Sequence, residues 1–408
     1  MKQYHRLPFL LLSMLILITV PGCSQTHIRS TDYSYQKPAQ IDDGLSPDHL
    51  LHVNMDTGII VELTKLILAD SFPNIHSVLI AKDNMLVYEN YFSGKDESWG
   101  SSLGYTMHDT NKLHDSRSIS KSVVAACIDI AIQHKQIISI DDPIFNYLPG
   151  YTEYKTPLNE KITIRHLLTM SSGIQWNENT PHGTSANNET QMERSLNPVK
   201  YVLQQPMSSF PGSVWNYNSG SVQVLAEIIK NVSGLDVDLF ASKFLFQPLN
   251  IQSYKWTRSS NTAILFHLTK IFNSRRSFPA AASGLRLTSR SLLKIGLLYL
   301  NNGAWNNIQV LSKKWVQETF KTQILRGTNS SANGYSYLFW THTDTVNNWS
   351  YPFITARGNG GQRIFICQPL HLVVVITAGN YNKRGIRNDG QFALDNYIIP
   401  ASIQKKTK

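Results

Sequence analysis

The chain is organised around the run Ser116-Arg117-Ser118-Ile119-Ser120-Lys121-Ser122, which precedes an apolar stretch from Val123 to Ile132. Apolar side chains recur in that stretch every three or four residues, and this spacing predicts a helix. Ser118 then lies in the first turn with Lys121 three residues further on, so that the hydroxyl and the amine share one helix face. A serine hydroxyl becomes a nucleophile only beside a base, and a lysine amine with a lowered pKa can be that base. The alternative interpretation of this pair alone is a helix-capping serine followed by a solvated lysine.

The composition is that of a globular protein. The 408 residues are 42% hydrophobic and 16% charged, which is enough for a large core and unlike a disordered chain, and the length favours two subdomains over one. The formal net charge is +10, but the basic residues are spread along the chain without a phosphate-binding glycine loop. Nucleic-acid binding is therefore not predicted, and proximity to an anionic envelope surface is the milder interpretation.

The first 22 residues have the pattern of a secretory signal peptide. Lys2 and Arg6 precede an apolar run from Phe9 to Val20, which is short for a membrane span. Gly22 directly before Cys23 resembles a bacterial lipobox, so we expect Cys23 to be lipidated and to anchor the protein in the bacterial cell envelope. Ser24 resembles the sorting signal for the outer membrane, and we expect the periplasmic side of that membrane, although the sequence does not specify the side. The alternative is cleavage nearby, which gives a soluble secreted protein.

Strand signals occur at both ends of the chain and are rare between them. The predicted strands alternate in hydrophobicity or are continuously apolar, and they lie at Ser77–Ala81, Met85–Tyr91, Gln362–Cys367 and Leu372–Thr377. Helical periodicity is clear over residues 59–68 and 289–300. We expect loops at Gly94–Gly104, which contains three glycines, and at residues 177–195, which are polar.

This order predicts an α+β fold with one antiparallel sheet that is built from both chain ends and flanked by helices. The expected divisions are a signal peptide at 1–22, a flexible tether at 23–46, a sheet domain from 47–140 and 281–403, and an inserted, mainly helical subdomain at 141–280.

Cysteine and histidine motifs give no metal-site signature. The sequence contains no Cys-x-x-Cys and no His-Glu-x-x-His, so we predict neither a metal nor another cofactor. Cys127 and Cys367 can form a disulfide in an oxidising compartment, but two separate buried thiols are favoured.

Several segments, taken together in order, resemble the serine β-lactamase-like hydrolases. These are the class C β-lactamases, the D-alanyl-D-alanine carboxypeptidases, related esterases and the aminohexanoate-dimer hydrolases. The resemblance covers nearly all of the chain from about residue 55 and rests on Ser118-Ile119-Ser120-Lys121, Ile140-Asp141-Asp142-Pro143, Tyr147-Leu148-Pro149, Ile162 to Gly173, Pro211-Gly212, Tyr217-Asn218-Ser219 and Gly358-Asn359-Gly360-Gly361-Gln362. Each segment alone is unspecific, but their order is specific. It implies a β-lactamase/transpeptidase-like fold.

The resemblance also implies roles. Ser118 attacks a carbonyl carbon and is acylated, and Lys121 takes its proton directly or through Tyr217. Tyr217 relays a proton to the leaving group and then activates the deacylating water. A tyrosine titrates near a pKa of ~10, so this role requires a cation that lowers the pKa and hydrogen-bond reach to Ser118 and Lys121. The alternative for Tyr217 is packing beside Trp215. The oxyanion hole is expected from the Ser118 N–H and an N–H of the glycine-rich segment: Gly358, Asn359, Gly360 and Gly361.

Two departures from the family pattern concern substrate binding. Ser219 stands where the second motif usually has asparagine, and Ala356-Arg357-Gly358 stands where the third usually has a lysine, histidine or tryptophan. Arg357 can replace the lysine that binds a substrate carboxylate. Both departures resemble the esterase and amidase branch more than the β-lactamases.

The sequence therefore predicts a serine hydrolase that cleaves an ester or amide of a small molecule or short peptide. One alternative is a penicillin-interacting D-Ala carboxypeptidase or β-lactamase. The other is a non-catalytic envelope scaffold or binding lipoprotein that keeps the fold. An α/β-hydrolase is disfavoured because no Gly-x-Ser-x-Gly occurs. The acyl group and the oligomeric state are not specified by the sequence.

Overall fold

The computed structural model describes residues 32–260, 277–327, 333–346, 348–383 and 389–403. The predicted signal peptide and Cys23 lie outside the described residues. None of the described helices is long and apolar enough to cross a membrane.

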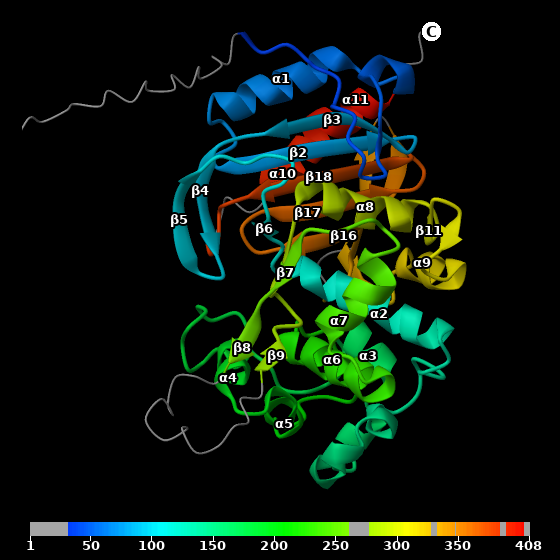
Figure 1. The fold of residues 1–408 in the computed structure, drawn as a ribbon. Coiled ribbons are helices and arrows are strands. Elements are labelled where there is room, and N and C mark those ends of the chain that lie inside the picture. Colours follow the sequence, from blue (N-terminus) through cyan, green and yellow to red (C-terminus); the bar gives the residue numbers. More distant parts are fainter. Residues whose placement is uncertain (1–31, 261–276, 328–332, 347, 384–388, 404–408) are drawn as a thin grey trace, which may run out of the picture.

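A nine-stranded sheet joins the two ends of the described chain (Figure 1). Its order is β1-β3-β2-β18-β17-β16-β15-β14-β13, and every neighbouring pair is antiparallel except β1 with β3. The bounds are β1 Ser46–Pro47, β2 Ile75–Lys82, β3 Met85–Tyr91, β13 Ile324–Leu325, β14 Asn333–Tyr335, β15 Trp340–Val346, β16 Trp349–Gly358, β17 Gln362–Cys367 and β18 Leu372–Ala378. The central pairing of β2 with β18 confirms the prediction of one antiparallel sheet assembled from both ends.

Helices cover both faces of the sheet. In Figure 1, α1 (Thr57–Leu68) and α11 (Ile399–Ser402) lie at the top of the sheet, and α8 (Ser289–Leu300) lies beside β17 and belongs to the other core. Strand β18 is buried on both sides: Val374 belongs to the core under α1, and Val375 belongs to the core that also contains α8. This alternation follows from the two-residue period of a strand, and it explains why β18 reads as a continuous apolar run.

A mainly helical region occupies the lower half of Figure 1. Its helices are α3 Ile164–Leu168, α4 Asn188–Arg194, α5 Pro198–Leu203, α6 Ser219–Ser233 and α7 Val237–Ala241. The long helix α2 (Ile119–Gln133) packs against α6, so that the start of α2 lies where the helical region meets the sheet.

Short strands and helices complete the described chain. Strand β6 pairs with β10, which pairs with β7, and this small sheet leads directly into the Ser118 turn. The bounds are β4 Gly94–Ser98, β5 Ser101–Thr106, β6 His114–Asp115, β7 Tyr254–Trp256, β8 Arg258–Ser260, β9 Ser277–Pro279, β10 Leu285–Leu287, β11 Ala304–Trp305, β12 Ile308–Gln309, α9 Lys313–Thr319 and α10 Asp389–Ala393.

Three expectations need correction. The loop expected around Gly94 and Gly104 is the hairpin β4–β5, because Trp99 (φ 50) and Gly100 (φ 82) both adopt the left-handed backbone of a tight two-residue turn. The loop expected at residues 177–195 contains helix α4. The tether expected at 23–46 does not extend through its described part, because the Tyr35 hydroxyl donates to the Val87 carbonyl at 2.8 Å and Leu45 is buried.

The two described cysteines are buried and free, as favoured from the sequence. Cys127 lies in the core that contains α8 and Cys367 in the core under α1.

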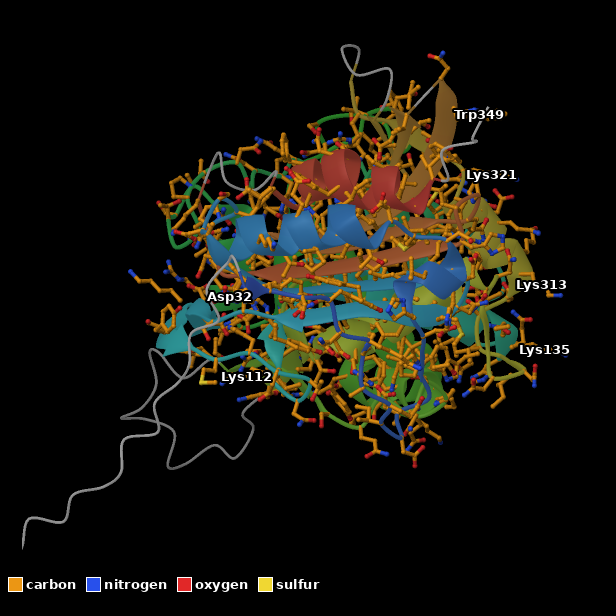
Figure 2. The ribbon with its side chains drawn as sticks, turned by 90° about the horizontal axis from the view of Figure 1, so that it is seen from above. Asp32, Lys112, Lys135, Lys313, Lys321 and Trp349 are labelled. Carbon is orange, nitrogen blue, oxygen red and sulfur yellow. The ribbon has the colours of Figure 1, made fainter. Side chains whose placement is uncertain are left out.

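Figure 2 views the molecule from above α1, and its labelled lysines, Lys112, Lys135, Lys313 and Lys321, lie at separate places along the outline.

Candidate active site

Ser118 and Lys121 meet at the start of helix α2. Ser118 is the residue just before the helix, and the Lys121 Nζ lies 3.0 Å from the Ser118 Oγ. The Lys121 side chain is 1% exposed, and its Nζ also donates to the carbonyl of Ala282 at 3.0 Å. Arg117 before the serine has φ 48, a left-handed conformation that is uncommon for a residue with a side chain. Its guanidinium is ion-paired with Glu97 and, at 3.2 Å, with Asp115, and these pairs fix the turn.

Tyr217 reaches the same hydroxyl from the helical region. Its side chain is hydrogen-bonded to Ser118, and the Lys121 Nζ lies 4.9 Å from the centroid of its ring. Asn218 caps helix α6 directly after it, because its Oδ1 accepts from the Ser221 N–H at 3.0 Å. The structure therefore brings the three predicted catalytic side chains together, although Tyr217 lies almost a hundred residues from Ser118 and Lys121 along the chain.

Burial changes the proton affinities of this group. It lowers the pKa of the Lys121 amine, while Glu189, Glu178 and Glu193 act in the opposite direction. Burial raises the pKa of Tyr217, and the charge of Glu178 adds to this rise. The expectation that a cation lowers the pKa of Tyr217 is therefore wrong: desolvation of the phenol raises this pKa, and the hydrogen bond with Ser118 opposes the rise only in part. The phenol stays neutral, and the Lys121 amine is the easier group to deprotonate.

Glu178 is a residue of this site that the sequence analysis missed. Ser219 donates to its carboxylate twice, from the backbone N–H to Oε1 at 2.5 Å and from Oγ to Oε2 at 3.0 Å. Burial, with the charge of Glu189 next, raises the pKa of Glu178 to about 7. Ser219 thus orients this carboxylate, and none of the described hydrogen bonds of Ser219 reaches Ser118. No spacing marks Glu178, because it lies in a polar segment that belongs to none of the quoted motifs.

The glycine-rich segment lies beside the nucleophile turn. A Cβ added at Gly358 would lie 2.4 Å from the carbonyl oxygen of Ser116, so the end of β16 touches the backbone two residues before Ser118. Gly360 (φ 95) and Gly361 (φ 103) form the left-handed turn into β17. The side chain of Asn359 binds Asn382, by donating to its Oδ1 at 2.6 Å and accepting from its N–H at 2.9 Å. The Asn359 amide side chain is therefore already engaged on this turn.

Two arginines flank an aromatic pair at the site. The ring of Trp340 stacks on that of Tyr217 with centroids 5.8 Å apart. The guanidinium carbons of Arg326 and Arg357 lie 4.4 Å and 5.3 Å from the Trp340 centroid. Within the described residues, the Nε atoms of both arginines are buried without a hydrogen-bond partner. Burial and Arg326 lower the pKa of Arg357 to about 10, which leaves Arg357 charged at neutral pH. Arg326 was missed in the sequence because it belongs to no motif.

One set of side chains in the described ranges has the composition of a metal-binding group: His76, Asp96, His108 and His114. It lies just before the nucleophile turn and not around Ser118. The sequence search missed it because its members come from four separate elements and match no fixed spacing.

The sheet between helical layers, the inserted helical region and the serine–lysine–tyrosine group define the class of serine β-lactamase and transpeptidase folds. The chain belongs to the Beta-lactamase family, whose model matches residues 76–394. Members of this family are serine hydrolases.

The relatives of the chain carry several activities. The structure "Putative 6-aminohexanoate-dimer hydrolase from Bacillus anthracis" is 20% identical with a TM-score of 0.64, over 82% of this chain and 81% of that chain. EstCE1, a hydrolase with promiscuous acyltransferase activity, is 16% identical with a TM-score of 0.60, over 84% of this chain and 98% of that chain.

One curated relative, an uncharacterized protein of Alkalihalophilus pseudofirmus, is 24% identical over 58% of this chain. The match spans 61% of that relative, so it is less than two thirds of its length.

Proposed function

We propose that the protein is a serine hydrolase that cleaves an ester or amide through an acyl-enzyme on Ser118. The observation that carries this proposal is that Lys121, buried and 3.0 Å from the Ser118 Oγ, shares that hydroxyl with Tyr217. A buried amine with a lowered pKa is a better proton acceptor at neutral pH than a solvated lysine.

The proposed reaction has two halves. In the first, the Ser118 hydroxyl forms a bond to the acyl carbon and passes its proton to the neutral Lys121 amine. The bond to the leaving group then breaks, and the neutral phenol of Tyr217 gives that group its proton while Lys121 restores the phenol. In the second half, a water molecule gives a proton to the neutral Lys121 amine and its oxygen bonds to the acyl carbon. The bond between that carbon and the Ser118 Oγ then breaks, and Lys121 returns the proton to the Oγ.

We assign the oxyanion site to backbone N–H groups. The Ser118 N–H lies at the start of α2, where a helix leaves its donors without helical acceptors. The end of β16 at Gly358 lies against Ser116 and can supply the second N–H. One such donor contributes about 10²–10³ in kcat in acyl-transfer enzymes.

The activity is tested with p-nitrophenyl acetate and intact-mass analysis. We expect hydrolysis by the full chain, an added acyl mass on Ser118, and the loss of both in Ser118→Ala. Equal rates for the two proteins would contradict the proposal and favour a scaffold that keeps the fold.

A second candidate function is the binding of an acyl compound with a carboxylate, such as a β-lactam or a D-alanyl peptide. The two arginines beside Trp340 favour it, because their buried Nε donors have no partner among the described residues and their charges attract an anion. Labelling of Ser118 by a fluorescent penicillin would support this candidate. If the protein has esterase activity but is not labelled by the penicillin, only the proposal of an ester or amide hydrolase remains.

We also propose that Cys23 is lipidated and holds the enzyme in the outer membrane on its periplasmic side. The lipobox-like residues before Cys23 support this proposal. Metabolic labelling with a fatty acid should mark the wild-type chain and not Cys23→Ala. An unlabelled wild-type chain in the culture medium would show a secreted protein instead.

A further inference from the structure

Four metal-type side chains converge behind the nucleophile turn. His76 lies in β2, Asp96 in β4, His108 in the loop after β5, and His114 in β6. One ligand atom from each lies within 4.8 Å of the others. Their rings are in contact: the centroids of His76 and His108 are 4.0 Å apart, and those of His76 and His114 are 5.1 Å apart.

The outer hydrogen bonds fix which nitrogen of His76 carries a proton. Its Nε2 lies 3.3 Å from the Oδ1 of Asn74, and an amide oxygen can only accept. The orientation of that amide is set by Lys95, whose N–H donates to the Asn74 Oδ1 at 2.8 Å and whose carbonyl accepts from Nδ2 at 2.9 Å. His76 therefore carries its proton on Nε2, and its Nδ1 presents a lone pair.

The same reasoning applies to His114. Its Nδ1 lies 3.2 Å from the carbonyl oxygen of Asp115, so Nδ1 carries the proton and Nε2 presents a lone pair. The two lone-pair nitrogens, His76 Nδ1 and His114 Nε2, face each other at 2.8 Å. Two lone pairs at this distance repel unless a cation lies between them.

Two more buried atoms point to the same cation. Asp96 is 4% exposed, and its Oδ2 has no hydrogen-bond partner in the described chain, while its Oδ1 lies 3.7 Å from the His114 Nε2. The Nε2 of His108 is buried and also without a partner there. A buried carboxylate in this position costs free energy unless a positive charge neutralises it.

We propose that His76, Asp96, His108 and His114 bind one divalent transition metal ion, with zinc as the expected metal. Three imidazoles and one carboxylate complete the four-coordinate shell of a closed zinc site. Ligands on tetrahedral zinc lie about 3.3 Å apart, so the two facing nitrogens separate by about half an ångström when the ion binds.

A shared proton is the competing explanation for the facing nitrogens. A proton on either facing nitrogen of a neutral ring would turn the lone pair of that ring's other nitrogen toward an acceptor oxygen, the Asn74 Oδ1 at 3.3 Å or the Asp115 carbonyl at 3.2 Å. The hydrogen bonds from His76 and His114 to amide and carbonyl oxygens are the supporting contacts that metal-binding histidines usually make.

The site would tie the active-site turn to the sheet. His114 is followed by Asp115, whose carboxylate forms ion pairs with Arg286 at 2.8 Å and with Arg117 at 3.2 Å. Ser118 lies three residues after Asp115. Tyr381, which lies against the Gly360 turn, donates to the Asp96 Oδ1 at 3.2 Å. A metal here joins β2, β4 and β6 behind both the nucleophile and the glycine-rich segment, and it has a structural role.

The test uses the full chain, stripped with a chelator and then equilibrated with zinc. We expect one zinc per chain by elemental analysis after gel filtration. Asp96→Asn and His108→Asn should weaken zinc affinity by at least about tenfold in an indicator competition. His134→Asn, which removes an exposed histidine at the far end of α2, should leave it unchanged.

Cobalt replaces zinc in a measurement that needs no variant. The wild-type chain should develop the visible bands of four-coordinate Co²⁺ with nitrogen and oxygen ligands. A wild-type chain that retains no metal would overturn the proposal, and so would equal affinity in both ligand variants. A sulfur-to-cobalt band would overturn it as well, because it would place the ion on a cysteine.

Discussion

Replacing Gly358 by alanine tests whether the strand end beside Ser116 is part of the catalytic geometry. The new Cβ would lie 2.4 Å from the Ser116 carbonyl oxygen, and the obstacle is backbone that cannot rotate away. The two segments must separate by about 1 Å to reach an ordinary contact. A misplacement of this size costs about 10²-fold in rate, and loss of one oxyanion donor costs about 10²–10³ in kcat. Overpacking costs about 1–3 kcal/mol of stability.

Gly390→Ala is the matched control. It makes the same chemical change in α10, where the added Cβ would meet its nearest neighbour, the Arg363 Cγ, at 3.5 Å. We expect Gly358→Ala to lose about 10²-fold in kcat/KM for p-nitrophenyl acetate while it still unfolds cooperatively. The control should stay close to wild type. If Gly358→Ala kept wild-type kcat/KM in a folded protein, the strand end at Gly358 would not be part of the oxyanion site.

The remaining predictions concern charge. Lys121→Met should lower kcat/KM about 10²–10⁴-fold, the contribution of general base catalysis, in a chain whose circular dichroism is unchanged. In the wild type, kcat/KM should rise with pH as the Lys121 amine loses its proton, with a midpoint below 10.5 because burial lowers this pKa; a flat profile would exclude Lys121 as the base. Ser219→Ala removes one hydrogen bond to the Glu178 carboxylate and should destabilise the protein by about 1.5–3 kcal/mol in urea unfolding. Arg357→Gln should raise KM for an acyl substrate with a carboxylate and leave that for a neutral ester unchanged; equal effects would show that Arg357 only supports Trp340.

Much of the fold could be predicted because its elements are specified locally. Helix α8 has the predicted bounds, since its apolar face repeats along every turn. The β2–β3 hairpin joins two strands that their hydrophobic alternation predicts, and its turn residues Asp83 and Asn84 are of types that accept a left-handed backbone. The β4–β5 hairpin makes the same turn with Trp99 and Gly100. This hairpin was not predicted, because tryptophan is not a typical turn residue. What decides this turn is the pairing of the strands on either side, which is not visible in the two turn residues.

The candidate site also contains residues that local sequence specifies and residues that only the fold brings together. Ser118 and Lys121 could be paired from their spacing, because a helix sets the distance between residues three apart. Glu178, Arg326 and the four metal-type side chains could not be found, because the fold alone brings them together. The direction of the Tyr217 pKa failed for a related reason. Proximity of a cation can be inferred from a motif, whereas burial is a property of everything that packs around the phenol.

This burial shifts the pKa values of the two proton-carrying groups in opposite directions. Lys121 and Tyr217 share one hydroxyl and one desolvated environment, but desolvation acts on opposite charge states: it disfavours the ammonium and also disfavours the phenolate. In the proposed reaction, the same environment therefore favours the lysine as the base and the tyrosine as the acid. Glu178 limits the first effect and strengthens the second, because its negative charge favours the ammonium and opposes the phenolate. Its own pKa of about 7 means that this influence grows as the pH rises through neutrality. Ser219, in the place where related enzymes carry an asparagine, thus bears on the proton chemistry through the carboxylate that it holds.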